Sequence, residues 1–412
     1  MSWSPNFWEK FFTPFHQLHP ETKRNSYKAY KDIHNIFRVA MVRPYLFASQ
    51  IAAAAGMNPY KKAHHVMEEL WKRECPVSYK AAFEGASEKG HPDEVAAAVT
   101  LVEGGAALCD KAISHGNTAK TAEMVGESIA SCTTGVERNI ADLQTKLDNL
   151  QVDDISQARK ALKDVNKEVA VAAAAAVAAV SNATRTGAAA DTMILKAAEC
   201  ARGRQKQAKV KVAALESTDA GAEFVKVDKQ LQATQKVAEE LKKAVRTTFG
   251  TAREADVVTR YEASAGVKVL RDTKCYSKDL DGIDARFGGR VDGLIAGDCV
   301  LEIKNRVSRL FTSVPLYEMV QVQAYMELLD RPRAILLQCL RKGGEVCLQS
   351  TEISRDRKMW KGTVLPRLAA FVAALEAVAS DPLTTGKGYA ELDDEARDAF
   401  LDAFCNEGGD GI

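Results

Sequence analysis

Apolar residues recur with a helical period through the middle of the chain. Between residues 81 and 248, runs such as Ile140, Leu143, Leu147 and Leu150 place an apolar residue at every third or fourth position. This spacing is typical of helices that bury one face, and short heptad runs favour packing as a hairpin or a coiled coil. We therefore expect residues 81–248 to form a long all-helical segment.

Beyond this segment, short strand-like runs alternate with helical stretches. This alternation, with glycines and charged turns between the runs, indicates an α/β unit. We predict that residues 249–380 form the unit around a mixed central sheet. The predicted helices span about 251–265, 315–329 and 356–379, and the predicted strands lie near 267–270, 290–295, 299–304, 333–340 and 345–352.

The two ends of the chain differ from both segments. Residues 1–80 carry aromatic residues at helical spacing, which predicts a helical part packed on the α/β unit. Within it, residues 44–74 predict a turn, a short helix, a loop and a second helix. Residues 381–412 are acidic and end in glycines, so we expect a frayed tail.

Composition limits the surroundings in which the chain acts. Lys and Arg total 56 against 55 Asp and Glu, so the net charge of +1 gives no global field for nucleic acid, and a DNA-binding surface must be a local patch. The longest apolar run, Val169 to Val180, is too short and too rich in alanine to span a bilayer, so we expect no membrane partner. Nine cysteines without a CxxC pair favour reduced thiols in an intracellular protein, cytoplasmic or nuclear.

Candidate chemistry is concentrated in GGRVDGLIAGDCVLEIKNR, residues 288–306. This stretch predicts a hairpin whose turn, at residues 297–298, joins two strands. Because side chains alternate along a strand, Glu302 and Lys304 project from one face, and the hairpin places Asp292 beside them. Two carboxylates and a lysine at one place form a coherent centre for phosphodiester hydrolysis.

Such a centre needs a divalent cation. Oxygen ligands suit Mg²⁺, for which Mn²⁺ could substitute, and the cation would polarise the phosphate and lower the pKa of a bound water. We expect Asp292 and Glu302 to hold it with the backbone carbonyl of Leu301 or Ile303, while Lys304 orients or deprotonates the water. The alternative is a solvated strand face, because a Glu-x-Lys triplet is common on exposed strands.

Four blocks of the chain, in order, resemble the lambda exonuclease and YqaJ viral recombinase family of the PD-(D/E)XK nuclease superfamily. The blocks are ASQIAAAAGMNPYKK at residues 48–62, FGTAREADVVTRYEASAGVKV at 249–269, the hairpin itself, and EMVQVQAYMELL at 318–329. The resemblance implies a PD-(D/E)XK core, in which the segment 81–248 is a large helical insertion that the compact phage enzymes lack.

The first two blocks imply roles for residues outside the hairpin. The resemblance places Ser49 and Arg43 near a DNA phosphate, and the alternative for Ser49 is a helix cap, which serine forms well. It also places Glu254 facing the metal site. The alternative for Glu254 is a surface carboxylate paired with Arg253 or another neighbour.

The last two blocks complete the implied site and show where the chain departs from the family. Gln321 and Tyr325 fit a Q-xxx-Y helix, where they share one face, with Gln321 near the active site and Tyr325 near DNA; an amphipathic surface helix is the alternative. The family usually has prolines before the Asp and after the Lys of the hairpin. This chain has Val291 before Asp292, and Asn305-Arg306 after Lys304, which puts local strand-end geometry in doubt.

The resemblance implies a Mg²⁺-dependent exonuclease that degrades duplex DNA ends 5′ to 3′ for recombination. It also implies a single-strand annealing protein as partner and a homo-oligomer, and it leaves a viral origin open. Two alternatives remain, namely an endonuclease of the same fold and a non-catalytic DNA-binding scaffold built on the helical segment. The basic run ARGRQKQAKVK, residues 201–211, predicts either a phosphate contact or the solvated face of a helix.

Overall fold

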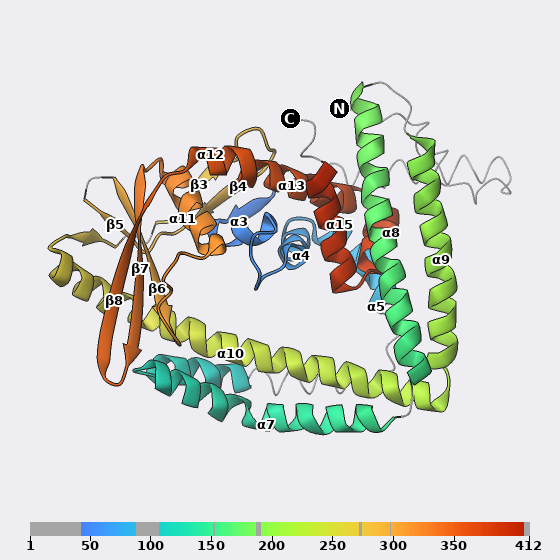
Figure 1. Ribbon diagram of the computed structural model, residues 1–412, viewed down its shortest axis with the longest axis horizontal. Coiled ribbons are helices and arrows are strands. Elements are labelled where there is room, and N and C mark those ends of the chain that lie inside the picture. Colours follow the sequence, from blue (N-terminus) through green and yellow to red (C-terminus); the bar gives the residue numbers. More distant parts are fainter. Residues whose placement is uncertain are drawn as a thin grey trace.

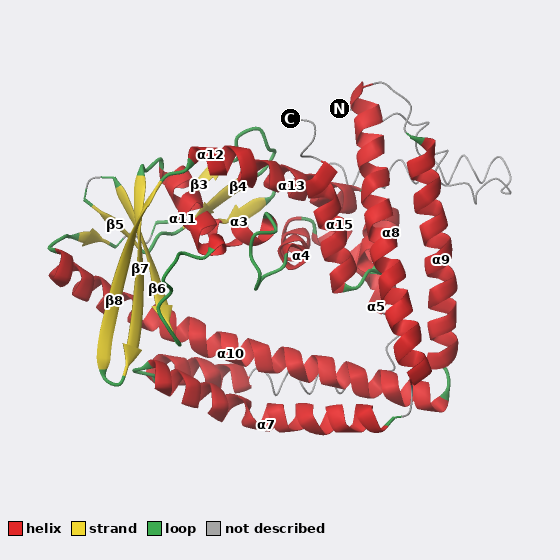
Figure 2. Cartoon of the chain, viewed as in Figure 1, coloured by secondary structure: helices red, strands yellow, loops and turns green. Residues whose placement is uncertain are grey.

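The structure is a computed structural model that describes residues 43–87, 107–150, 153–186, 191–271, 274–296 and 298–407. The aromatic helix expected near the start of the chain lies outside these residues. Strands gather on one side of the molecule, and long helices make up most of the rest (Figure 2).

The predicted α/β unit is built on a five-stranded mixed sheet of order β2-β5-β6-β7-β8. Strands β6 and β7 run parallel because α11 crosses between them, and the other neighbouring pairs are antiparallel. All five predicted strands are therefore confirmed, with shifted ends. They are β2 (Val269–Leu270), β5 (Gly293–Ile295), β6 (Cys299–Arg306), β7 (Arg333–Lys342) and β8 (Glu345–Ser354), and the crossover helix is α11 (Leu316–Leu329).

The two faces of this sheet are covered by different helices. On one face, Leu301 and Ile303 of β6 are buried in a cluster with Val257 and Val258 of α10 (Asp219–Ala265). On the other face, Val300 of β6 belongs to the main core together with apolar residues of α11. Strand alternation thus directs the even-numbered side chains of β6 towards α11, as the sequence predicts.

A second sheet, which the sequence pattern did not predict, has the order β1-β4-β3. Here β1 (Tyr45–Phe47) pairs in parallel with β4 (Arg286–Gly289), and β4 pairs with β3 (Tyr276–Asp279) in antiparallel fashion. At Gly288 a Cβ would lie 2.1 Å from the Tyr45 hydroxyl oxygen, so only glycine allows the strands to approach this closely. This sheet joins the start of the described chain to the α/β unit.

Helix α10 corrects the predicted start of the first α/β helix. It ends as expected, before Gly266 in the left-handed conformation, but it begins at Asp219 rather than near residue 251. Its first turn is capped by the Thr218 hydroxyl, which accepts from the Gly221 backbone N–H at 3.1 Å. The boundary placed between residues 248 and 249 therefore falls inside one continuous helix.

The helical segment forms a frame that leaves the α/β unit and returns to it (Figure 1). Helix α7 (Ala122–Asn149) lies along α10, while α8 (Asp153–Thr186) pairs with α9 (Thr192–Glu216) and rises towards α15 (Asp394–Glu407). Helix α8 is fixed to α15 by ion pairs of Lys163 and Lys167 with Glu395. The expected packing of long helices in pairs is present.

Residues 381–407, the described part of the acidic C-terminal tail, are largely helical and not frayed, which corrects the prediction for this part. After α12 (Arg357–Met359), a π-helical turn (Trp360–Val364) and α13 (Leu365–Ser380), the chain continues through a second π-helical turn (Pro382–Gly386), α14 (Lys387–Ala390) and α15. Leu392, Phe400 and Leu401 are at most 6% exposed and belong to the main core. Within α15, Asp394, Glu395 and Asp402 are exposed while Phe400 and Leu401 are buried, so the acidic composition alone misrepresented the segment.

The remaining elements complete this core. Helices α3 (Ala48–Ala54) and α4 (Ala63–Glu74) are the short helix and the second helix predicted over residues 44–74, with the predicted loop between them, and α5 (Pro76–Ser87) follows. The segment Arg357–Ser380 is long and apolar enough to cross a membrane. In this structure its residues Val364, Leu368 and Phe371 are at most 1% exposed within the main core.

Candidate active site

The β5–β6 hairpin places Asp292 against the strand that carries the other predicted acid. Gly293 pairs with Leu301, so Asp292, one residue earlier, comes level with Glu302. The Asp292 Oδ2 atom accepts a hydrogen bond from the Ile303 backbone N–H at 2.6 Å, which fixes the carboxylate at the edge of β6. The spatial arrangement on which the sequence argument depends is therefore present.

Glu302, Lys304 and Gln321 form a closed triangle of hydrogen bonds between β6 and α11. The Lys304 ammonium lies 2.8 Å from Glu302 Oε1 and 3.0 Å from Gln321 Oε1. The Gln321 amide also donates to Glu302 Oε1 at 2.9 Å. Gln321 is therefore the helix residue that faces the strand pair, whereas Gln323 bonds to the Ser354 carbonyl away from it.

One more charged pair extends this polar face along β6 and α11. Arg306, two residues beyond Lys304, makes two hydrogen bonds of 2.6 and 2.7 Å to Glu318, three residues before Gln321. Both partners are largely buried, with side chains 11% and 3% exposed. Sequence reasoning did not single out this pair, although strand and helix periodicity place Arg306 on the face of Lys304 and Glu318 on the face of Gln321.

The departures from the family's proline pattern have local consequences. Asn305 continues β6 and donates to the Gly250 carbonyl at 2.8 Å, which ties the strand to α10. The family's proline falls at the next position, Arg306, and a proline there could not make the bonds of Arg306 to Glu318. The strand end is thus supported by side chains where the family uses a rigid residue.

Glu302 has an unfilled acceptor beside Asp292. Its side chain is 5% exposed, and its Oε2 atom is buried without a hydrogen-bond partner among the described residues. Burial, and then the neighbouring charge of Glu302, raise the pKa of Asp292 to about 8, against the opposing effect of the Ile303 N–H bond. A divalent cation between the carboxylates would satisfy the free oxygen and relieve this repulsion, so the residues fit Mg²⁺.

Lys304 remains a cation in this environment. Burial by itself would lower the pKa of its ammonium group, but the charge of Glu302 and the hydrogen bond to it raise the pKa instead. The group therefore acts as a fixed positive charge and hydrogen-bond donor. An ammonium with a raised pKa suits the orientation of water or the neutralisation of charge better than the removal of a proton.

The structure places Glu254 in the electrostatic field of the same cluster. Burial raises the pKa of Glu254, Arg271 opposes the rise, and the charge of Glu302 adds to it. The alternative partner Arg253 instead donates to the Ala119 carbonyl at 2.5 Å. A role for Glu254 at a bound cation stays a prediction.

Strand geometry also decides which backbone carbonyl faces Asp292. The N–H and C=O groups of a residue in a strand point to the same side. The Ile303 N–H points to Asp292, so the Ile303 carbonyl points to the same edge of β6. This edge is free of β5 here, because the last pair of the β5–β6 ladder is Gly293 with Leu301. Ile303 therefore suits the predicted ligand role.

Tyr325 lies beside the site but is buried. Its side chain is 6% exposed, and burial, followed by the charge of Glu302, raises the pKa of its hydroxyl. A Cβ at Gly289 would lie 3.2 Å from the Tyr325 ring, so the glycine makes room for the ring at the end of β4. A DNA contact by Tyr325 stays a prediction and would require DNA to enter the site.

Ser49 and Arg43 lie on the surface near the end of the second sheet. Both are exposed. Ser49 does not cap α3, whose N-cap is Phe47, so the helix-cap alternative is wrong. Arg43 forms ion pairs with Asp284 at 2.5 Å and with Asp279 at 3.4 Å. Contact with a phosphate stays a prediction for both residues.

Two further arginines belong to the surroundings of the acids and were not predicted. Arg290 and Arg271 are exposed, and their charges oppose the rise in the pKa of Glu254 that burial causes. Arg290 could have been found from the sequence because it lies two residues before Asp292. The basic run 201–211 gives a weaker signal, since Arg204 and Lys209 pair with Glu168 and Glu391 at 2.8 and 2.5 Å.

Two acids and a lysine on the β5–β6 hairpin of a mixed sheet, joined by a glutamine from α11, define a candidate hydrolytic centre. The family model of the YqaJ-like viral recombinase domain matches residues 169–331, which confirms the family resemblance found in the sequence. The match contains Glu254 and the site from Asp292 to Tyr325, begins within α8, and leaves Ser49 and Arg43 outside. It supports a nuclease or recombination function.

Other comparisons add little. No curated protein matches the chain. The crystal structure of SSO0001 aligns with 34% of this chain and 65% of its own length, with 17% sequence identity and a TM-score of 0.25. This likeness is too low to support an argument about fold or function.

Proposed function

We propose that the chain is a Mg²⁺-dependent deoxyribonuclease with a PD-(D/E)XK centre. One observation carries the proposal. Among the described residues, a buried oxygen of Glu302 has no hydrogen-bond partner, the pKa of Asp292 is raised by burial and by the charge of Glu302, and Lys304 is bonded to the other oxygen of Glu302. A merely structural Glu302–Lys304 pair would leave no reason for a second buried acid at this place.

The residues divide the work of phosphodiester hydrolysis among them. Asp292, Glu302 and the Ile303 carbonyl would hold Mg²⁺, which when bound polarises the phosphate and acidifies a water. Lys304 presents its ammonium group next to these ligands and would orient the attacking water or balance the developing charge. Gln321 holds Lys304 and Glu302 in register through one amide group, so it is a positioning residue.

The finer assignment follows the family resemblance. The proposed substrate is a duplex DNA end, degraded 5′ to 3′ to leave a single strand for annealing and recombination. Mn²⁺ is the expected substitute for Mg²⁺, because it also accepts oxygen ligands. A single-strand annealing protein and a second copy of the chain are the proposed partners, in an intracellular setting.

The test compares linear and covalently closed DNA with wild type and two lysine variants. Wild type should release nucleotides from linear duplex in Mg²⁺ and leave the closed circle intact, and a label at either end gives the polarity. Lys304→Ala should reduce the rate by about 10²–10⁴-fold, the range for a positioned acid–base or charged group. Lys243→Ala, on the exposed face of α10, should act like wild type.

Three outcomes would change the proposal in different ways. Cleavage of the closed circle would favour the endonuclease alternative. Release starting from the 3′ end would overturn the polarity. Equal background release by wild type and Lys304→Ala would refute catalysis and favour a DNA-binding scaffold.

A further inference from the structure

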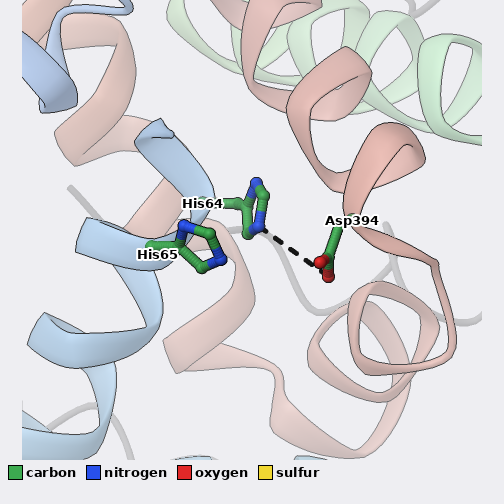
Figure 3. A group of neighbouring side chains, drawn as sticks. All are labelled: His64, His65 and Asp394. Carbon is green, nitrogen blue, oxygen red and sulfur yellow. Dashed lines mark ion pairs between the residues drawn. The ribbon is translucent and has the colours of Figure 1, made fainter. Parts of the chain in front are cut away.

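A second group of possible metal ligands lies far from the nuclease site in the sequence. His64 and His65 begin α4, and Asp394 begins α15 (Figure 3). One ligand atom from each residue lies within 4.8 Å of the other two. Because adjacent helix positions point about 100° apart, sequence spacing alone does not indicate a metal site at the two histidines.

His64 is prepared as a ligand by its surroundings. Its Nδ1 atom lies 2.7 Å from Asp398 Oδ1, and because a carboxylate only accepts hydrogen bonds, the proton must be on Nδ1. In the neutral ring, Nε2 then carries the lone pair. This carboxylate–histidine arrangement is the outer partner that fixes ring orientation in many metal sites.

The free nitrogen of His64 points to the other two residues. The side chain of His64 is 1% exposed, and Nε2 is buried without a hydrogen-bond partner among the described residues. The nearest carboxylate oxygen, Oδ1 of Asp394, is 3.8 Å away, too far for a hydrogen bond (Figure 3). A buried imidazole nitrogen therefore faces an incomplete set of partners.

We propose that His64 Nε2, His65 and Asp394 bind Zn²⁺, with a water as fourth ligand. Two imidazoles and a carboxylate are ligands that zinc accepts, whereas Mg²⁺ prefers oxygen. Bonds of about 2.0 Å place tetrahedral ligand atoms about 3.3 Å apart. Asp394, 71% exposed, and His65, also exposed, can close this gap by side-chain rotation while His64 stays fixed.

Neighbouring charges leave room for the cation. Arg397 lies 3.6 Å from Asp394, and Lys62 lies 3.6 Å from Asp398, both beyond hydrogen-bond length. Arg397 makes its shorter contact, 2.9 Å, with Glu68. Asp394 can therefore turn to the metal without losing a close partner.

The proposed ion would fasten α15 to α4. Because α15 also packs on α8, the ion would help to hold α8 of the helical frame against the main core. Binding to the folded state alone stabilises it by mass action, so Zn²⁺ should raise the melting temperature.

The experiment uses full-length chain with Asp292→Asn, which removes a carboxylate from the nuclease centre, in excess Mg²⁺. Zn²⁺ titration should show one saturable site and a rise in melting temperature, and Co²⁺ should give a visible absorption band of imidazole-bound ion. His65→Ala and Asp394→Asn should each weaken affinity at least 10-fold and remove the thermal shift. Asp398→Ala should weaken it 10–100-fold, as loss of an outer partner does.

Two matched variants control for general effects. His115→Ala removes a histidine elsewhere, and Glu376→Gln removes an exposed carboxylate from α13, and both should bind like the parent. Absence of saturable Zn²⁺ binding would overturn the proposal. Equal affinity in the parent, His65→Ala and Asp394→Asn would also overturn it, because the ion would then lie elsewhere. Neither result depends on nuclease activity.

Discussion

Replacement of Asp292 by asparagine should abolish activity while stabilising the metal-free protein. Asparagine keeps the shape of the side chain and an oxygen that can accept the Ile303 N–H bond, but it carries no charge. The pKa of Asp292 is about 8 in the folded chain, compared with 3.8 for an aspartate without interactions. Between these two pH values the unfolded chain has lost this proton, so the wild type must take up a proton when it folds.

The sign and size of the effect follow from this difference. Below a pH of about 4, the carboxyl group is protonated in both states, so the variant has no advantage. Between about 4 and 8 only the unfolded chain ionises, and the wild type loses about 1.4 kcal/mol of stability per pH unit. Above a pH of about 8 the carboxyl group ionises in both states, and the difference in stability between the variant and wild type becomes constant. At pH 7 the free energy of unfolding of the variant should exceed that of wild type by on the order of 4 kcal/mol.

The assay is denaturant unfolding in EDTA at pH 5, 6 and 7, with nuclease activity measured in parallel. The advantage of Asp292→Asn should grow by about 3 kcal/mol from pH 5 to pH 7. Asp281→Asn, an exposed carboxyl in the β3–β4 turn, is the matched control and should follow wild type. Addition of Mg²⁺ should stabilise wild type alone.

Parallel pH profiles for wild type and Asp292→Asn would refute the reasoning. They would mean that Asp292 is ionised in the metal-free fold, and that the Ile303 N–H bond and Lys304 outweigh burial. A variant that keeps full nuclease activity would separately exclude Asp292 from the metal site.

Two further predictions concern the same face of β6. Because Asp292 holds a proton below a pH of about 8, Mg²⁺ binding should release close to one proton at pH 7 and about half a proton at pH 8; calorimetry in buffers of different ionisation enthalpy measures this, and release that does not change with pH would contradict it. Arg306→Met should destabilise the chain by about 3–5 kcal/mol, because it leaves the buried Glu318 carboxylate without its counter-charge. Adding Glu318→Gln to Arg306→Met should recover part of the lost stability in thermal unfolding. If Arg306→Met alone melted at the same temperature as wild type, the pair would not be structural.

Local pattern was enough to predict the hairpin that carries Asp292, Glu302 and Lys304. Alternation along residues 299–304 fixes which side chains share a face, and the short turn at 297–298 fixes the pairing of the two strands. The register Gly293 to Leu301 then brings Asp292 level with Glu302. The face of α11 that carries Gln321 and Tyr325 follows from helical spacing in the same way.

Helix ends were less predictable where packing opposed propensity. The helix predicted from about residue 251 begins just after Gly250, and glycine within a helix costs about 1 kcal/mol relative to alanine. Phe249 and Val245 are nevertheless at most 1% exposed in a cluster with α7, and their burial continues α10 through this point. The acidic tail shows the same effect, because Phe400 and Leu401 find a core that composition does not reveal.

By itself the sequence determined the elements and the chemistry carried by neighbouring residues. Only the tertiary structure decided which distant segments meet: β1 beside β4, Asn305 against Gly250, and His64 against Asp398, 334 residues away. The physical reason is that periodicity reports which face of an element is buried, whereas the partner of that face depends on how the whole chain packs. A hairpin contains both partners of its contacts, so its site was visible in the sequence, and the histidine–aspartate group was not.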